Sequence, residues 1–196
     1  MKLKNKILWF ILGFLSCIII LVIIFFYVKN TQVDSIKKDL TNYKQNKIEV
    51  EIYSINANVL DSLKFINLKT GKIFCVNDDN IHYTFINYWA TWCAPCVAEL
   101  PEFEKLLNGK SLKNKDIKFI FSSFENTEKI RNFINKKGFD LPFYQYNYDK
   151  KPACINHTTI PTTYLIDEKE LLIYKFSGIQ KWNSKFIKSI LKNIIK

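Results

Sequence analysis

Arginine is almost missing from this 196-residue chain. Of its 29 basic residues only Arg131 is an arginine, although the formal net charge is +11. Proteins that read nucleic acid rely on the planar guanidinium fork for contacts with bases and phosphates. The lysine excess therefore predicts a solvated surface near anionic lipid, and we expect no nucleic-acid partner.

Cysteine and histidine are also scarce. Five cysteines in a chain of this length do not make a disulfide scaffold. A structural zinc site needs four ligands, but the only paired spacing is Cys93 with Cys96, and the remaining cysteines and two histidines supply no second pair. We therefore expect no metal and no other cofactor, and a metal-binding cysteine pair stays as an alternative.

Charge is missing from residues 7–28, which form an unbroken apolar run. As a helix this run would be roughly 33 Å long, enough for a bilayer core. Three lysines precede it, and positive charge before a first span favours a cytoplasmic N-terminus. The sequence thus predicts residues 1–6 in the cytoplasm, 7–28 as a single transmembrane anchor, 29–47 as a linker and 48–196 as an extracytoplasmic domain.

Two other interpretations of the N-terminal run remain open. A cleaved signal peptide has a shorter apolar region and a small-residue cleavage site, whereas this run ends in Phe25, Phe26, Tyr27 and Val28. The residues up to Cys17 loosely resemble a lipoprotein box, but large apolar residues follow and suit a membrane interior better. We expect a retained anchor.

The repeating pattern changes along residues 48–196. From 48 to 80, apolar and polar residues alternate around a turn at Gly71, which predicts a small β-hairpin or meander, the N-terminal β extension. Strands and helices alternate afterwards, which predicts an α/β domain with a mixed central sheet flanked by helices. The expected strands are residues 83–89, 117–122, 143–146, 162–167 and 171–176. The expected helices are residues 93–108, 127–137 and 183–195, the second with Asn126 or Thr127 as cap and Gly138 as its end.

The two motif cysteines stand where a buried strand gives way to a helix. A thiol in the first turn of a helix faces unpaired backbone N–H groups and the positive end of the helix dipole. That environment favours thiolate over thiol, so we expect Cys93 to be the reactive sulfur and Cys96 its resolving partner. Pro95 is compatible with a first helical turn, where its missing N–H costs little.

Two landmarks make this chain resemble the thioredoxin-like proteins. Residues 89–96, WATWCAPC, match the redox signature, and residues 160–167, IPTTYLID, match the cis-proline loop and the strand after it. With the apolar N-terminal run, the β extension and Glu99, residues 48–196 look like the TlpA/ResA group of anchored thiol–disulfide oxidoreductases. The resemblance implies a thioredoxin-like fold and a bacterial protein with its domain on the periplasmic side of the inner membrane.

The resemblance also assigns roles to residues. It implies a redox-active disulfide between Cys93 and Cys96, and substrate contacts through Trp92, Ile160 and a cis Pro161. Thioredoxin has a buried aspartate where this chain has Asn87, which cannot act as a base. Glu99, three residues past the second cysteine, is the substitute that we expect to transfer a proton. Its alternative role is a favourable charge near a helix N-terminus.

These features predict a reductant of protein disulfides. Oxidants of this fold stabilise the reduced thiolate with polar side chains between the cysteines, and Ala94 and Pro95 supply none. The resemblance implies recharging by a membrane electron donor of the DsbD/CcdA type, and apocytochromes c among the substrates. An oxidase or isomerase, and a non-enzymatic metal-binding or chaperone-like module, are the alternatives. Cys75 and Cys154 are candidates for a second disulfide.

Overall fold

The structure is a computed structural model, and it describes residues 18–29, 31, 50–76, 81–109, 112, 116–146, 155 and 157–195. The chain divides into two compact units, Met1–Asn46 and Lys47–Lys196. In the first unit, residues 18–29 form a helix with exposed side chains. Within the described ranges, no helix is both long enough and apolar enough to cross a membrane. The predictions for residues 1–17 and 32–49 lie outside the described residues, and so do those for Cys17 and Cys154.

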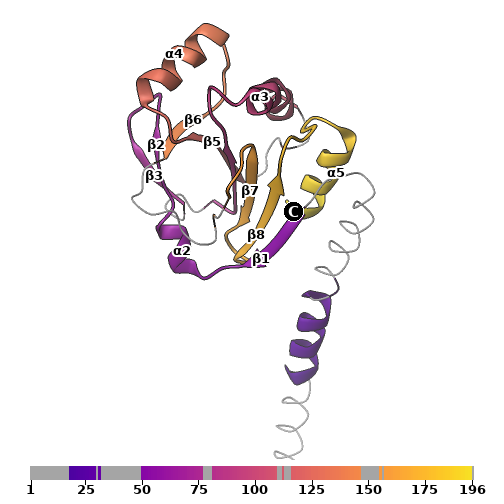
Figure 1. The fold of residues 1–196 in the computed structure, drawn as a ribbon. Helices are drawn as coiled ribbons and strands as arrows, with labels where there is room; N and C mark the ends of the chain where they lie inside the picture. The colour runs from indigo at the N-terminus through magenta and orange to yellow at the C-terminus, as the bar shows by residue number, and fades with distance from the viewer. Residues whose placement is uncertain are drawn as a thin grey trace, which may run out of the picture. The chain divides into compact units, whose positions relative to one another are not determined.

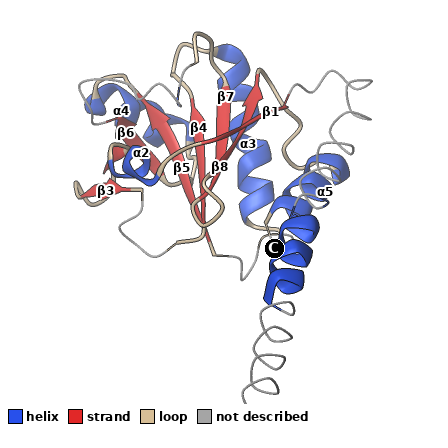
Figure 2. Ribbon diagram, turned by 90° about the horizontal axis from the view of Figure 1, so that it is seen from below, coloured by secondary structure: helices blue, strands red, loops and turns tan. Residues whose placement is uncertain are grey.

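The described part of the second unit contains a mixed sheet of eight strands in the order β1-β8-β7-β4-β5-β6-β2-β3 (Figure 1). Figure 2 shows the strands as one twisted sheet with the helices outside it. The strands are β1 Val50–Ser54, β2 Lys64–Asn67, β3 Ile73–Cys75, β4 Tyr83–Tyr88, β5 Ile117–Ser123, β6 Phe143–Tyr146, β7 Thr162–Asp167 and β8 Leu172–Ser177. The helices of this unit are α2 Ala57–Asp61, α3 Ala94–Leu107, α4 Thr127–Lys137 and α5 Lys185–Ile194. The predicted mixed α/β sheet is confirmed.

The central strand β4 is buried along its whole length because both faces of the sheet are covered. Successive side chains of a strand point to opposite faces. Phe85 therefore packs toward Phe103 of α3, at a ring-centroid distance of 5.7 Å. Its neighbour Ile86 belongs to the core on the other face, together with Leu60 of α2. Aromatic and aliphatic burial on both faces fixes the strand from which the cysteine motif continues.

The N-terminal β extension is arranged differently from the predicted hairpin or meander. The hairpin exists, because β2 and β3 pair antiparallel and β2 also pairs with β6. The first strand β1 does not join them. It pairs with β8 at the opposite edge of the sheet, with Val50 opposite Phe176. The short helix α2, which the sequence pattern did not predict, connects the two edges and buries Leu60. Alternation identifies a strand but not its partner, and the partner of β1 lies near the other end of the chain.

One end of the sheet gathers the parts of the site. β4 runs parallel to β5 and antiparallel to β7, and β7 runs antiparallel to β8. Tyr88, Ser122, Thr162 and Ser177 therefore lie in one row across the sheet. We call this row the Tyr88 end. The loops that leave β4, β5 and β8, and the loop that enters β7, all meet there.

Candidate active site

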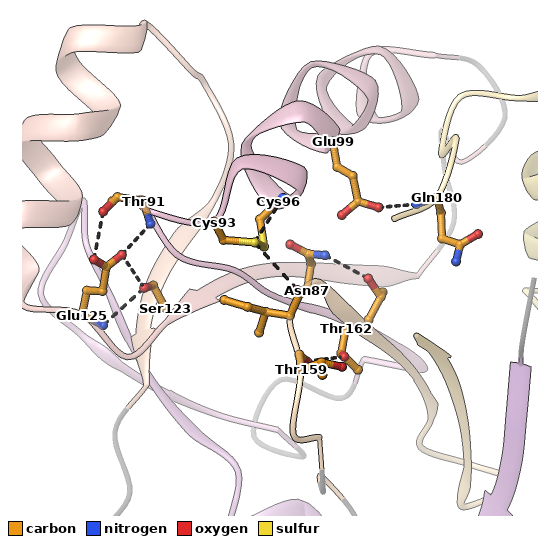
Figure 3. The surroundings of a disulfide bond; sticks show 12 residues. Asn87, Thr91, Cys93, Cys96, Glu99, Ser123, Glu125, Thr159, Thr162 and Gln180 are labelled. Carbon is orange, nitrogen blue, oxygen red and sulfur yellow. Dashed lines mark hydrogen bonds between the residues drawn. A yellow bond between two sulfur atoms is a disulfide. The ribbon is translucent and has the colours of Figure 1, made fainter. Parts of the chain in front are cut away.

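The cysteine pair lies where the chain leaves β4 at the Tyr88 end and enters α3 (Figure 3). Cys93 is the N-cap of α3, and its sulfur accepts a hydrogen bond from the Cys96 N–H at 3.3 Å. A disulfide joins the two cysteines, whose Cα atoms are 5.3 Å apart. Pro95 stands in the first turn as predicted. When the disulfide is reduced, the unpaired N–H groups of this turn stabilise a thiolate on Cys93.

The proline loop before β7 lies against the reactive sulfur. The peptide bond between Ile160 and Pro161 is cis, as the resemblance implied. The Sγ atom of Cys93 lies 3.8 Å from the carbonyl oxygen of Ile160. The Thr162 hydroxyl donates to the Thr159 carbonyl at 2.7 Å, which holds the loop on the side of β7 (Figure 3). A reduced Cys93 thiol is placed to donate to the Ile160 carbonyl.

The two sulfurs differ in their neighbours at the surface. Cys96 is 1% exposed and Cys93 is 5% exposed, whereas Trp92 directly before it is 63% exposed. An incoming disulfide therefore meets Cys93 first, beside the indole ring of Trp92. The division of roles, with Cys93 as the reactive sulfur and Cys96 as its resolving partner, stays a prediction.

Glu99 is a buried carboxyl one turn further along α3. Its Oε1 atom accepts hydrogen bonds from the Gln180 backbone N–H at 2.5 Å and from the Trp182 indole N–H at 2.9 Å. Its Oε2 atom is buried and has no hydrogen-bond partner among the described residues. Burial raises the pKa of Glu99 to about 7, although the two hydrogen bonds lower it. Near neutral pH the protonated and the ionised form of this carboxyl are therefore both populated.

Asn87 occupies the buried position on β4 where thioredoxin has an aspartate. Its side-chain amide donates to the Thr163 hydroxyl at 2.9 Å. An amide does not titrate, so Asn87 cannot exchange protons with the cysteines. Its hydrogen bond joins β4 to β7 below the disulfide.

Glu125, which the sequence pattern did not single out, lies on the other side of the disulfide from Glu99 (Figure 3). Its carboxylate accepts hydrogen bonds from the Thr91 N–H at 2.5 Å and the Thr91 hydroxyl at 2.9 Å. The Lys129 ammonium lies 2.6 Å away. Burial pushes the pKa of Glu125 upward, but the bonds from Lys129 and Thr91 outweigh it and hold the pKa below its ordinary value. The sequence indicates only its position, because loops after adjacent parallel strands meet at one end of a sheet, and that position alone does not single out this acidic residue.

Large apolar side chains are exposed around the disulfide. Trp92, Phe124 and Ile179 are 63%, 58% and 57% exposed, and we call them the apolar rim. They follow β4, β5 and β8, so all three stand at the Tyr88 end. In the described part of the second unit, the only other large hydrophobic residue of comparable exposure is Ile73 on β3.

The two histidines and Asp167 make further side-chain contacts in the described part of the domain. His157 lies against Tyr88, and its Nδ1 atom is 3.3 Å from the Tyr164 hydroxyl. His82 is half-buried and contacts Asp167 at 3.3 Å. Asp167 accepts a hydrogen bond from the Glu170 N–H in the turn after β7. In the ranges that the structure describes, no three His, Cys, Asp or Glu side chains are grouped to hold a metal ion.

Comparison with known proteins identifies the family. The Redoxin profile matches residues 80–194, which is more than half of the chain. Thioredoxin-like protein YneN from Bacillus subtilis is 35% identical over 111 residues, covering 54% of this chain and 64% of that protein. Thiol-disulfide oxidoreductase ResA from Bacillus thuringiensis is 29% identical, covering 56% and 63%. The matched region thus spans just under two thirds of these relatives.

Solved structures agree on the fold. The crystal structure of StoA from Bacillus subtilis superposes with a TM-score of 0.50 at 18% identity, covering 71% of this chain and 96% of that one. The chain belongs to the Redoxin family, and its resemblance to the TlpA/ResA group of thioredoxin-like proteins is confirmed.

Proposed function

We propose that this protein is a thiol–disulfide oxidoreductase that reduces disulfide bonds in other proteins. One observation carries the proposal: the Cys93 sulfur caps α3 and lies 3.8 Å from the Ile160 carbonyl, directly before a cis proline. This arrangement presents one activated sulfur beside a backbone edge. The similarity to a protein named thiol-disulfide oxidoreductase ResA supports the same chemistry.

The reaction begins with both cysteines reduced. The Cys93 thiolate attacks one sulfur of the target disulfide, and the other target sulfur leaves as a thiolate that takes up a proton. A mixed disulfide now joins Cys93 to the target. The Cys96 thiolate then attacks the Cys93 sulfur, forms the Cys93–Cys96 disulfide and releases the second target thiolate, which is also protonated. Two electrons pass from the cysteine pair to the target.

Glu99 accepts the proton that Cys96 must lose. A thiol attacks only as its thiolate, and Cys96 is almost fully buried, so water cannot readily remove its proton. Glu99 follows Cys96 by three residues on α3, which puts both side chains on neighbouring positions of one helix face. With a pKa raised to about 7, its carboxylate accepts a proton near neutral pH and can return it.

A protein segment suits the surface around the disulfide. An extended segment can pair with the backbone at Ile160, as in β-strand addition. Apolar side chains of that segment then contact Trp92, Phe124 and Ile179, whose exposure is costly in water and is relieved by contact. These contacts support a macromolecular target over a small thiol.

The direction of the reaction follows from the residues between the cysteines. Potentials in this fold range from about −270 mV in thioredoxin to about −120 mV in DsbA, whose reduced form is stabilised. Ala94 and Pro95 have no side chain that stabilises a thiolate. The pair therefore belongs near the reducing end, and a measured potential near that of DsbA would overturn this assignment.

The location and partners belong to the same proposal. The charge-free run of residues 7–28 and the lysines before it support a single-pass anchor with the domain outside the cytoplasm. A tethered reductant of this kind is recharged by a membrane donor of the DsbD/CcdA type. Apocytochromes c that await haem attachment are a fitting substrate class.

A trapping experiment tests the proposed activity. The Cys96→Ser variant cannot resolve the mixed disulfide, so target proteins should stay covalently bound to Cys93 and be released by reductant for mass spectrometry. The unaltered protein should reduce the interchain disulfides of insulin, and Cys93→Ser should abolish both reduction and trapping. Cys75→Ser, which removes a cysteine outside the motif, is the matched control and should keep full activity. Insulin reduction by Cys93→Ser would contradict the mechanism.

A further inference from the structure

The turn between β4 and the reactive cysteine is held by a small number of hydrogen bonds among the described residues. Backbone hydrogen bonds run from the Trp89 N–H to Ser122 at 3.0 Å and from the Cys93 N–H to Ala90 at 3.1 Å. Between them lies Thr91, whose backbone N–H and hydroxyl both donate to the Glu125 carboxylate. Two donors from one residue to the two oxygens of one carboxylate fix both the position and the orientation of the turn.

Glu125 is itself held firmly. It is 9% exposed, its backbone N–H donates to the Ser123 hydroxyl at 3.3 Å, and that hydroxyl lies 3.5 Å from its carboxylate. The Lys129 ammonium on α4 is 2.6 Å from Oε1. A buried carboxylate is stable only when charged and polar partners satisfy it. Here the partners of the carboxylate are Thr91 of the motif turn, Ser123 at the end of β5 and Lys129 of α4.

We propose that Glu125 is a positioning residue of the redox site: through Thr91 it fixes the turn that places Cys93 at the start of α3 and beside Ile160. Paired with Lys129, it also sets the electrostatic field at the Cys93 sulfur. The inference rests on the proposed oxidoreductase function. Glu125 touches neither sulfur, so it acts only through the turn and through its charge.

The charges of Glu125 and Lys129 have opposite effects on a thiolate at Cys93. A carboxylate bound to Thr91, two residues before the reactive cysteine, disfavours a thiolate on Cys93, whereas the Lys129 ammonium favours it. Because the two charges adjoin, their effects largely cancel in the unaltered protein. Removing one leaves the other uncompensated, so single substitutions of the two residues must shift the Cys93 pKa in opposite directions.

The test measures the Cys93 pKa from thiolate absorbance in the reduced full-length protein, together with the reduction potential against glutathione. Glu125→Gln should lower the Cys93 pKa by about half a unit and make the potential less negative. Lys129→Gln should raise the Cys93 pKa by a similar amount and make the potential more negative. The double variant should return toward the unaltered values. Glu128→Gln and Lys136→Gln remove the same charges from exposed positions of α4 and should change neither quantity.

The positioning role has a separate measurement. Thr91→Val removes one donor without altering charge, and should slow the attack of Cys93 on a model disulfide by about fivefold while leaving the Cys93 pKa in place. Thr91→Ser keeps the hydroxyl and should restore the rate.

Several outcomes would overturn the inference. Shifts of the same sign in Glu125→Gln and Lys129→Gln, or a Thr91→Val rate equal to that of the unaltered protein, would show that these residues only support the fold. A protein without any disulfide exchange would instead contradict the proposed function, before the variants are compared.

Discussion

A single carboxyl oxygen distinguishes this site from a simple pair of cysteines. Glu99 is buried, its Oε1 atom accepts two hydrogen bonds, and its Oε2 atom accepts none from the described residues. Burial without full compensation favours the protonated form, and the pKa rises from 4.5 to about 7. The residue thus links proton exchange at the site to the free energy of folding.

Glu99→Gln should change how stability depends on pH. In the unfolded chain Glu99 ionises near pH 4.5, and in the folded protein near 7, so between these values the unfolded state holds fewer protons. Stability from this group is therefore fully present below pH 4.5 and is lost as pH rises to about 7, on the order of 3 kcal/mol. Urea unfolding from pH 4 to pH 8 should show this decrease in the unaltered protein and a flatter curve in Glu99→Gln.

The same variant has a catalytic readout. The rate of insulin reduction should lose its inflection near pH 7, because the amide that replaces the carboxyl cannot exchange a proton. If Glu99→Gln leaves both the pH–rate profile and the cysteine pKa values unchanged, the catalytic role is wrong and the residue is only buried.

At the scale of single residues, local spacing in the sequence identified functional residues, whereas contacts between residues far apart in the sequence could not be predicted. Cys93 and Cys96 were predictable because two thiols three residues apart at a helix start carry their chemistry in the sequence itself. Pro161 needed the resemblance, since a cis bond leaves no mark in composition. Glu125 could not be identified, because its partner Thr91 lies 34 residues earlier and one acidic residue after a strand is an ordinary pattern.

Among the helices and strands, α4 is one whose two ends can be predicted from local sequence. Asn126 caps it by accepting a hydrogen bond from the Glu128 N–H, and Gly138 ends it with φ of 73°. Both were predictable, because caps depend on residue type at fixed positions. The pairing of β1 with β8 was not predictable, because the alternation of apolar and polar residues identifies a strand but does not indicate which distant strand it pairs with.

The apolar rim on the loops at the Tyr88 end is expected to bind the target protein. Replacing both Phe124 and Ile179 with serine should raise the KM for a protein disulfide about tenfold, since each loses apolar contact with the target. Reduction of glutathione disulfide, which is too small to cover the rim, should proceed at the unaltered rate. Ile73→Ser, at a residue that is 58% exposed on β3, is the matched control. Equal effects of Ile73→Ser and the rim variant on KM would contradict a binding role for the rim.

For the whole molecule, the proposed tether predicts where the protein is found. The full chain should remain with membranes after extraction at alkaline pH, and reduced Cys93 should react with a membrane-impermeant thiol reagent in intact cells. Leu21→Lys combined with Ile24→Lys places two charges in the apolar run and should release much of the protein. Labelling that requires cell lysis would place the domain in the cytoplasm and contradict the proposed orientation.

The place where β1 joins the sheet has a geometric consequence for that tether. Val50 pairs with Phe176, next to the row that contains Thr162 and the proline loop, so the polypeptide enters the domain at the end that carries the redox pair. Whatever their conformation, the residues between 28 and 50 extend no further than roughly 75 Å. If residues 7–28 span the bilayer, this contour length confines the disulfide to a thin layer above the membrane. At a given number of copies, its local concentration near a membrane-bound electron donor would then be higher than that of the same domain free in solution, because the accessible volume is smaller.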